Sequence, residues 1–404
     1  MNSGDYMLVC IAGKNDIAVN VLDYIFNYRD ILNKLDIVCI VNKSDKGENN
    51  WQRSLKFECE KRKIKLVSLE DIYNIENLVF LSLEFDKIID PEKFVSNQLY
   101  NIHFSLLPKY KGMYTSILPI LNNEKETGVT LHRIDEGIDT GEIIAQRRIP
   151  IEKDDNSYAV YKKLIASGTE LVISYLPDLL FNKCSSIPQQ QENSTYFSKN
   201  AIDFSQIEIN VFQTAWQVFN QVRAFAFRPY QLITFCGFKI LKCKVLESKS
   251  KFRPGTVLEQ NSDFIKIATI DYDILLFRDQ FNVLLSAIRD FDNKKAVSIL
   301  KNREYIFEKE EHGWNALIVA TYVNNKEIFY YLLELGADIH EKNNNGTNLL
   351  MYAKDNYKQT NDSEIFDFLM KNGLDIYERD YYGKTLVDYC KLEKINKIGD
   401  SILY

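Results

Sequence analysis

The first ninety residues alternate short apolar runs with segments of helical pattern, and this alternation constrains the fold more than any other feature of the chain. The first run, Met7–Ala12, is apolar throughout and ends at Gly13. Further runs follow at Asp36–Val41, Lys65–Val67 and Leu78–Ser82. Short continuous runs of this kind are typical of parallel strands that are buried on both faces. Strands that alternate with helices predict an open α/β sheet, with ligand sites at the carboxyl ends of its strands.

A turn at one such strand end contains Gly13, Lys14 and Asn15. Its backbone N–H groups and the Lys14 ammonium are suited to meet a phosphate. A solvated loop lysine is an equally good interpretation of Lys14. The turn lacks the Gly-x-Gly-x-x-Gly pattern, so a nicotinamide cofactor is not predicted.

The size and charge of the chain narrow its functional class. Its 404 residues are enough for two or three domains. It has 50 Lys and Arg against 56 Asp and Glu, so it offers no overall basic field for nucleic acid. No cluster of His, Cys and carboxylate residues has the spacing of a metal site. The seven scattered cysteines, without a Cys-x-x-Cys pair, are typical of a reduced protein. The first apolar run is too short for a signal sequence or membrane span, and we expect a cytoplasmic protein without membrane association.

Two polar motifs carry the candidate chemistry, Asn-Ile-His-Phe-Ser-Leu-Leu-Pro at 101–108 and Asp-Glu-Gly-Ile-Asp-Thr-Gly at 135–141. Asn101 and His103 are two residues apart, and alternate residues of a strand point to the same side of a sheet. Asp139 follows a strand pattern on a glycine-flanked turn, which suits a carboxylate that a loop delivers to a site. An amide donor, an imidazole and a carboxylate together suit acyl transfer to an amine. The structural alternative is a buried histidine in a satisfied hydrogen-bond network.

In this order and at this separation, the two motifs resemble those of the folate-dependent formyltransferases. The resemblance implies that Asn101, His103 and Asp139 are the catalytic residues and that N10-formyltetrahydrofolate is the formyl donor. It also implies that the pterin ring is held largely by backbone groups of two loops. The corresponding residues here are Leu81, Leu83, Phe85, Asp135, Gly137 and Ile138. We interpret His132, on the strand before the second motif, as a partly exposed sheet residue.

The resemblance continues through a polar linker at 185–193 and covers residues 7–278. An Arg-Ala-Phe…Pro turn at 223–230 matches the turn that closes the active site of the formyltransferases. Arg223 and Arg228 are candidates for phosphate contact, because the guanidinium fork matches phosphate oxygens. Phe227 and Tyr230 are candidates for stacking on the substrate, with packing between domains as the slightly better explanation.

The tail beyond residue 280 repeats one sequence unit. Gly-Trp-Asn-Ala-Leu at 313–317 returns as Gly-Thr-Asn-Leu-Leu at 346–350 and again as Gly-Lys-Thr-Leu at 383–386. The spacing of 33 residues, with a later insertion near Gln359–Asp362, resembles ankyrin repeats, with Phe281–Glu311 as an imperfect first unit. Trp314 at a loop tip is a candidate anchor for an auxiliary ligand or a protein partner. A tryptophan that covers the preceding repeat is an equally good interpretation.

The expected architecture therefore has three parts. They are a Rossmann-like α/β formyltransferase domain at residues 1–200, a small mainly β domain at 201–279 and an α-helical ankyrin repeat module at 280–404. The two-part body resembles the nucleotide-sugar N-formyltransferases of bacterial surface polysaccharide synthesis, including O-antigen and lipopolysaccharide. With the ankyrin tail it is most similar to the dTDP-3-amino-3,6-dideoxyglucose N-formyltransferases.

That resemblance implies a dTDP-linked amino sugar as the substrate and a homodimer as the assembly. The position of the amine on the sugar, 3 or 4, and the nucleotide base rest on the resemblance alone. Two alternatives stay open. One is methionyl-tRNA formylation, although the catalytic part lacks the dense basic loop that a tRNA substrate calls for. The other is a scaffold in which the ankyrin array is the function and the enzyme domain is idle, which the complete catalytic trio argues against.

Overall fold

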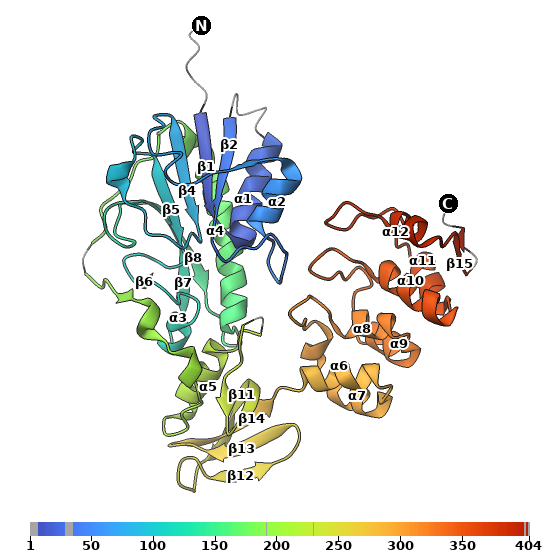
Figure 1. Ribbon diagram of the computed structural model, residues 1–404. Coiled ribbons are helices and arrows are strands. Elements are labelled where there is room, and N and C mark those ends of the chain that lie inside the picture. The colour runs from blue at the N-terminus through green and yellow to red at the C-terminus, as the bar shows by residue number, and fades with distance from the viewer. Residues whose placement is uncertain (1–6, 29–34, 191, 229, 400, 403–404) are drawn as a thin grey trace. The chain divides into compact units, whose positions relative to one another are not determined.

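The chain forms two compact units (Figure 1). The first contains the residues up to Glu48 and Arg53–Arg278, and the second contains Asn49–Gln52 and the residues from Asp279 onward. The computed structural model describes residues 7–28, 35–190, 192–228, 230–399 and 401–402. The fold class expected from the sequence is confirmed: an α/β region, a mainly β region and helical repeats follow one another along the chain.

The first unit is built on a seven-stranded sheet of order β3-β2-β1-β4-β5-β7-β8. Its strands are β1 Met7–Gly13, β2 Leu35–Val41, β3 Lys65–Leu66, β4 Leu78–Leu83, β5 Leu99–His103, β7 Glu126–Arg133 and β8 Ile143–Pro150. The first five of these strands are parallel, and β7 is antiparallel to both β5 and β8. The strand order reverses between β1 and β4, the kind of position where open α/β sheets bind ligands.

Helices α1 and α4 pack on one face of this sheet, where every second residue of the strands points into a shared hydrophobic core (Figure 1). Val9 and Ile11 of β1 point into the core beneath these helices, whereas Cys10 and Ala12 point into a second core on the other face. Burial on both faces explains why the first apolar run has no polar alternation. The helices of this unit are α1 Asn15–Tyr28, α2 Leu55–Arg62, α3 Leu118–Leu121, α4 Ser157–Leu180 and α5 Ala215–Ala224, with short 3-10 turns η1 Pro91–Lys93, η2 Lys199–Ala201 and η3 Phe204–Gln206.

A smaller antiparallel sheet of order β10-β11-β14-β13-β12 follows the main sheet. Its strands are β10 Thr234–Phe235, β11 Phe238–Lys249, β12 Val257–Gln260, β13 Phe264–Ala268 and β14 Tyr272–Arg278. Helix α5 packs against β11 and also against α3. It begins at Ala215, because Thr214 and Gln217 form a capping box there. Two further short strands, β6 Lys111–Gly112 and β9 Tyr196–Phe197, pair in parallel beside the main sheet.

The second unit is a stack of helix pairs. Its elements are α6 Phe281–Arg289, α7 Asn293–Leu300, η4 Arg303–Ile306, α8 Ala316–Tyr322, α9 Lys326–Glu334, α10 Leu349–Thr360, α11 Glu364–Lys371, α12 Leu386–Glu393 and a hairpin of β15 Lys397–Ile398 and β16 Ser401–Ile402. The side chains of Asn315, Asn348 and Thr385 cap the first helix of successive repeats. No helix within the described ranges is both long and apolar enough to span a membrane.

The repeating glycines let neighbouring loop tips approach each other closely. Gly313 has a φ of +85°, and a Cβ there would lie 2.6 Å from the backbone nitrogen of Asn344. The Asn344 N–H donates to the carbonyl oxygen of His312 at 3.2 Å. Gly346 stands in the same way against Tyr381 of the next tip. At Gly313 and Gly346 the glycine therefore serves both the turn and the contact between repeats.

We expect Gly313→Ala to destabilise the second unit more than Gly336→Ala does. Gly336 also has a positive φ, +98°, but no atom lies within 4 Å of its added Cβ. Gly336→Ala therefore costs only the left-handed strain, about 1–2 kcal/mol. Hydrogen exchange of peptides from residues 313–360 measures the difference, and equal exchange in the two variants would contradict the role given to the tip contact.

Candidate active site

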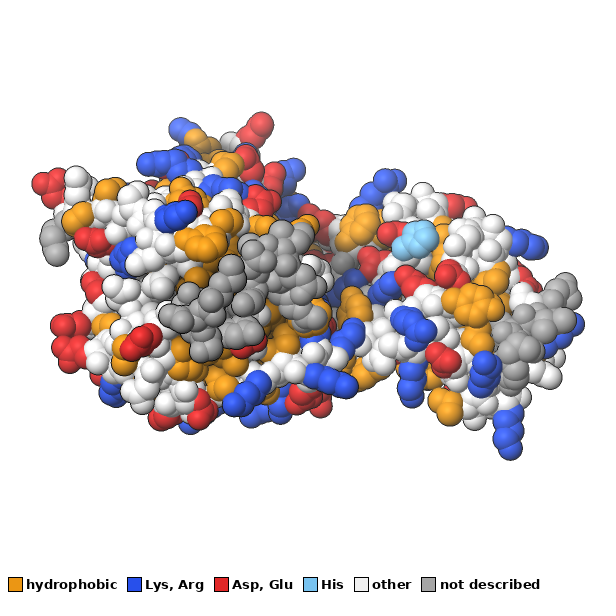
Figure 2. Space-filling view, turned by 90° about the horizontal axis from the view of Figure 1, so that it is seen from above, with side chains coloured by type: hydrophobic (Ala, Val, Ile, Leu, Met, Phe, Trp, Pro, Cys, Tyr) orange, Lys and Arg blue, Asp and Glu red, His pale blue; other side chains and the backbone are white. Residues whose placement is uncertain are grey.

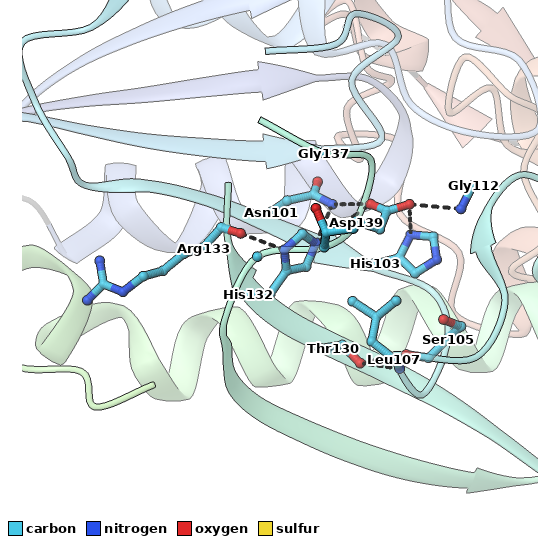
Figure 3. A network of polar contacts seen from close by, with 12 residues as sticks. Asn101, His103, Ser105, Leu107, Gly112, Thr130, His132, Arg133, Gly137 and Asp139 are labelled. Atoms are coloured by element: carbon cyan, nitrogen blue, oxygen red, sulfur yellow. Dashed lines mark hydrogen bonds and ion pairs between the residues drawn. The ribbon is translucent and has the colours of Figure 1, made fainter. Parts of the chain in front are cut away.

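The carboxyl end of β5 brings Asn101 and His103 to one side of the main sheet, and the turn after β7 brings Asp139 to them (Figure 3). Tyr100 and Ile102 alternate with these residues and are buried in the core on the opposite face. His103 Nδ1 lies 3.4 Å from Asp139 Oδ2, and Asn101 Nδ2 lies 3.4 Å from Asp139 Oδ1. The structure thus brings together the three residues that the sequence singled out.

The turn that carries Asp139 is held by its own residues. Asp135 Oδ1 accepts hydrogen bonds from the Gly137 N–H at 3.1 Å and from the Thr140 hydroxyl at 2.6 Å. Asp139 itself has a φ of +54°, in the left-handed region that costs a residue with a side chain some strain. At Gly141 a Cβ would lie 1.8 Å from the carbonyl oxygen of the last residue of β7. The residues of the sequence Asp-x-Gly-x-Asp-Thr-Gly therefore determine the conformation of this turn.

The Asp139 carboxylate contacts most of the other polar groups of the site. Its Oδ2 accepts a hydrogen bond from the Gly112 N–H at 2.8 Å, and its Oδ1 lies 3.7 Å from His132 Nε2. Burial by itself raises the pKa of Asp139, but the charge of His103, the nearby His132 and the Gly112 N–H outweigh it and lower the pKa to about 2. The group is therefore a carboxylate at every physiological pH.

The tautomer of His103 follows from its partners. Its Nε2 lies 2.8 Å from the carbonyl oxygen of Tyr110, which accepts hydrogen bonds and cannot donate them. Nε2 therefore carries the hydrogen, and Nδ1 is the atom that gains or loses a proton. Burial lowers the pKa of His103, and the Asp139 carboxylate beside Nδ1 opposes that shift. The ring is a neutral base with a stabiliser for its protonated form already in place.

His132 belongs to the site, and the expectation of a partly exposed sheet residue is wrong. Only 2% of His132 is exposed, because β7 pairs with β5 so that His132 stands opposite Asn101. His132 Nδ1 donates to the carbonyl oxygen of Arg133 at 2.7 Å, which leaves Nε2 as an acceptor. Asn101 Nδ2 donates to that nitrogen at 3.0 Å. His132 thus fixes which way the Asn101 amide points.

The residues predicted to hold the pterin divide into two kinds. The side chains of Leu81 and Leu83 are 1% exposed and lie in the core, so only their backbone groups can meet a ligand. Phe85 is half-buried and packs edge-on against Phe80. In the turn that carries Asp139, Ile138 is 40% exposed. Gly137 beside it is also exposed, whereas the Asp135 side chain is engaged within the turn.

The turn after β1 does not form the phosphate cradle expected from the sequence. The Lys14 N–H donates to the carbonyl oxygen of Leu83 at 3.3 Å, and a Cβ at Gly13 would lie 1.9 Å from that same oxygen. Gly13 thus permits close approach of β1 and β4. The Asn15 amide donates to the buried carboxylate of Glu84 at 3.1 Å. The Lys14 N–H and the Asn15 side-chain amide are therefore used within the protein, whereas the half-buried side chain of Lys14 stays a candidate for phosphate contact.

Two of the four candidates around the 223–230 turn serve packing. Arg223 donates to Asn220 Oδ1 and to the carbonyl oxygens of Glu152 and Asp155, at 3.0–3.1 Å, so it ties α5 to the loop before α4. Its guanidinium is thus engaged with protein groups, not held ready for a phosphate. Phe227 is 4% exposed, and the rings of Tyr158, Tyr161 and Tyr230 surround it, so it is not a stacking surface.

The other two candidates of this turn stay predictions. Arg228 is half-buried, and Tyr230 is 62% exposed. Pro229 of the same motif lies outside the described residues.

In the second unit, Trp314 belongs to an aromatic group. Its ring meets those of Tyr322 and Tyr352 edge-on, with centroids 5.2 and 5.0 Å away. Tyr352 is buried, Trp314 is half-buried, and Tyr322 is 37% exposed. The tryptophan thus packs within the repeats and also presents part of its surface.

Comparison with known proteins agrees with this geometry. Three family descriptions match the chain: "Formyl transferase" at residues 59–176, "Formyl transferase, C-terminal domain" at 202–284 and "Ankyrin repeats (3 copies)" at 284–380. The curated methionyl-tRNA formyltransferase of Listeria innocua serovar 6a is 32% identical over 213 residues, 52% of this chain and 67% of that protein. That of Dictyoglomus turgidum is 31% identical over 249 residues, 56% of this chain and 78% of that protein.

Solved structures extend the likeness. WlaRD, a sugar 3N-formyl transferase solved in the presence of dTDP and 5-N-formyl-THF, is 42% identical with a TM-score of 0.63. The match covers 68% of this chain and 98% of WlaRD. The N-formyltransferase of Helicobacter canadensis, in complex with folinic acid and dTDP-3-aminofucose, is 39% identical with a TM-score of 0.62. That match covers 68% of this chain and 100% of that one.

The chain belongs to the formyltransferase family. It is an N-formyltransferase that carries ankyrin repeats after its formyltransferase domains, as the sequence motifs indicated. Among the described residues, no group of three or more His, Cys, Asp or Glu side chains is arranged to hold a metal ion.

We expect Asp139→Asn to lower the pKa of His103 further, because the variant removes the negative charge that stabilises the imidazolium. The chain has four histidines, so NMR titration resolves each ring, and His103→Asn assigns the signal. Glu136→Gln, an exposed carboxylate of the same turn, is the matched control and leaves the pKa unchanged. A rise in the pKa of His103 in Asp139→Asn would contradict this electrostatic pairing.

Proposed function

We propose that the enzyme transfers the formyl group of N10-formyltetrahydrofolate to the amine of a dTDP-linked amino sugar, with dTDP-3-amino-3,6-dideoxy-D-glucose as the favoured acceptor. The observation that carries this proposal is the meeting of Asn101, His103 and Asp139 in one network. The two similar sugar enzymes support the acceptor class, since one was solved with dTDP and the other with dTDP-3-aminofucose, each with a formylated folate.

In the first step, the neutral amine nitrogen of the sugar forms a bond to the formyl carbon, and the formyl oxygen becomes an oxyanion. Asn101 is the donor that meets this charge. One of its N–H groups is held by His132, and the other lies at the longer distance of 3.4 Å from Asp139 Oδ1. The second N–H is the one that turns to the oxyanion. A single donor of this kind contributes about 3–4 kcal/mol to the transition state.

In the second step, the attacking nitrogen loses a proton, and His103 Nδ1 accepts it. The Asp139 carboxylate stabilises the resulting imidazolium, while the Tyr110 carbonyl oxygen keeps Nε2 protonated and the ring in place. The proton then moves to N10 as the bond between N10 and the formyl carbon breaks. Tetrahydrofolate and the formamido sugar leave, and both carboxylate and imidazole return to their starting states.

The surfaces that the site residues present support the ligand positions that we propose. We assign the pterin to the backbone of Leu81 and Leu83, to Phe85 and to the exposed part of the turn at Gly137 and Ile138. For the nucleotide sugar, Lys14, Arg228 and Tyr230 are the candidates, because they lie on loops with a charged or aromatic group not fully buried. The role in surface polysaccharide synthesis, the cytoplasmic location and the homodimer belong to the same proposal.

Methionyl-tRNA is the second candidate acceptor, because the curated relatives named above are methionyl-tRNA formyltransferases. A tRNA enzyme needs a basic surface that neutralises phosphates. On the face in Figure 2, Lys and Arg side chains lie among Asp and Glu side chains of both units. The net charge of −6 agrees with this mixture. We therefore favour the sugar.

We propose that the ankyrin repeats bind an auxiliary ligand or a protein partner at Trp314. The exposed parts of Trp314 and Tyr322 form an aromatic surface at a repeat tip, supported from below by the buried Tyr352. Such a surface suits a flat ring, for example the base of a second nucleotide sugar.

The test of the function is a formyl-transfer assay with N10-formyltetrahydrofolate and a panel of dTDP- and UDP-linked amino sugars. We expect product with dTDP-3-amino-3,6-dideoxy-D-glucose and none with His103→Asn, because asparagine has no group that accepts the amine proton. Circular dichroism checks that the variant folds. Turnover near the wild-type rate in His103→Asn would remove His103 from its role. Product with methionyl-tRNA and with no sugar would transfer the assignment to the tRNA reaction.

We expect Trp314→Ala to lose one dTDP-binding site while kcat stays unchanged. Isothermal titration calorimetry with dTDP gives the stoichiometry, and Trp216→Ala, a 47% exposed tryptophan of the first unit, is the control. The same number of sites in wild type and Trp314→Ala would exclude the nucleotide as the ligand of this surface.

A further inference from the structure

The segment that joins the two sheets of the first unit runs past the active site at two places. The first clamp segment is Ile187–Gln189, and the second is Thr195–Phe197. Ile187 exchanges two backbone hydrogen bonds with Ile143, at 2.8 and 2.9 Å, which fixes the first segment beside the start of β8. The sequence pattern indicated a polar linker at residues 185–193, which contains the first segment, but both segments make specific contacts with the turns that position the catalytic side chains.

In the first clamp segment, Gln189 holds the turn of Asp139. Its Nε2 donates to the carbonyl oxygens of Asp139 at 2.9 Å and of Gly141 at 2.8 Å. Both acceptors are carbonyl oxygens, so only the amide nitrogen can face them. Among the described residues, the buried Gln189 Oε1 has no hydrogen-bond partner, so nothing else sets the direction of this amide. One of the two bonds is thus made to the carbonyl oxygen of Asp139, the residue that is held at a φ of +54°.

In the second clamp segment, Thr195 and Phe197 hold the loop that follows the first catalytic motif. The Thr195 hydroxyl oxygen accepts from the Tyr110 N–H at 2.7 Å, and the Thr195 carbonyl oxygen accepts from the Lys111 N–H at 2.9 Å. The Phe197 carbonyl oxygen accepts from the Met113 N–H at 2.9 Å.

This second loop is the one that holds the catalytic pair. The carbonyl oxygen of Tyr110 takes the Nε2 hydrogen of His103, and the N–H of Gly112 binds Asp139 Oδ2. A Cβ at Gly112 would lie 2.3 Å from the carbonyl oxygen of Phe197, so the loop and the segment are in close contact. Each clamp segment thus hydrogen-bonds to main-chain groups of a turn or loop that positions a catalytic side chain.

We propose that Gln189 and Thr195 are positioning residues of the formyl transfer, which set the distance between His103 and Asp139 through the main chain of the two turns. This inference rests on the roles given to His103 and Asp139 under the proposed function. The joining segment then helps to position the active-site residues and also connects the main sheet to the small sheet.

The chain offers a matched pair of variants for the test. Gln189→Glu keeps the shape of the side chain but replaces the donor by a carboxylate, which repels two carbonyl oxygens. Gln190→Glu makes the same change of charge at the exposed neighbouring position. Thr195→Val removes the hydroxyl acceptor at constant shape, and Thr195→Ser restores it.

We expect Gln189→Glu and Thr195→Val to lower kcat about 10- to 100-fold, the loss that a misplacement near 1 Å produces, with KM for the amino sugar little changed. Gln190→Glu and Thr195→Ser keep kcat close to that of the wild type. If the two residues had a purely structural role, the variants would lower the melting temperature but would not lower kcat selectively at an unchanged KM.

The pKa of His103, followed by NMR, gives a readout that does not depend on turnover. The titratable or charged groups that face His103 are Asp139, His132 and Lys111. When Asp139 moves away, the imidazolium loses its stabiliser, so we expect the pKa of His103 to fall in Gln189→Glu and to stay constant in Gln190→Glu.

The outcomes separate the two proposals. The positioning role would be overturned if kcat and the pKa of His103 were equal in Gln189→Glu and Gln190→Glu and also equal in Thr195→Val and Thr195→Ser. The proposed function would still hold in that case, provided that the wild type formylates the sugar. If the wild type formylates no sugar, the proposed acceptor is wrong, and the NMR titration still decides whether the two segments position the pair. Should Gln189→Glu fail to fold, the Thr195 pair makes the same decision alone.

Discussion

The site depends on one buried carboxylate, because every other group in it is arranged around Asp139. Its two oxygens face an amide, two imidazoles and a backbone N–H. A charge in such surroundings is stable only when polar partners replace water, and here those partners include Asn101 and His103. The same carboxylate therefore orients both the amide and the imidazole of the site. To bring the carboxylate there, the backbone of Asp139 adopts a strained left-handed conformation, and Gly141 packs closely against the backbone at the end of β7.

Much of the fold and the centre of the site follow from short-range signals in the sequence. Continuous apolar runs predict the parallel strands, because both faces of the sheet are covered. The spacing of Asn101 and His103 predicts a shared side, since strand side chains alternate. The glycine-flanked Asp139 predicts a tight turn. Each of these features is decided by residues a few positions apart, where pattern and structure have a direct physical link.

The features that the sequence did not reveal depend on pairing between distant segments. His132 faces the site only because β7 pairs with β5 in one register, and a shift of one residue would turn it to the other face. Arg223 and Phe227 have side chains suited to a ligand, but their neighbours in the folded chain use them for packing. The contacts of Gln189 and Thr195 are made through the main chain of their partners, so the identity of those partners leaves no trace in the motif.

The parallel pairing of β6 with β9 has a consequence for how such enzymes can be recombined. The "Formyl transferase" family description ends at residue 176, whereas the pairing draws residues 195–197 back to the loop that binds His103 and Asp139. A chimera that joins this domain to a foreign partner between these limits would keep Asn101, His103 and Asp139 but lose contacts that hold their loop. A joint placed after Phe197 would keep those contacts, and the ankyrin repeats, matched at residues 284–380, lie well beyond it.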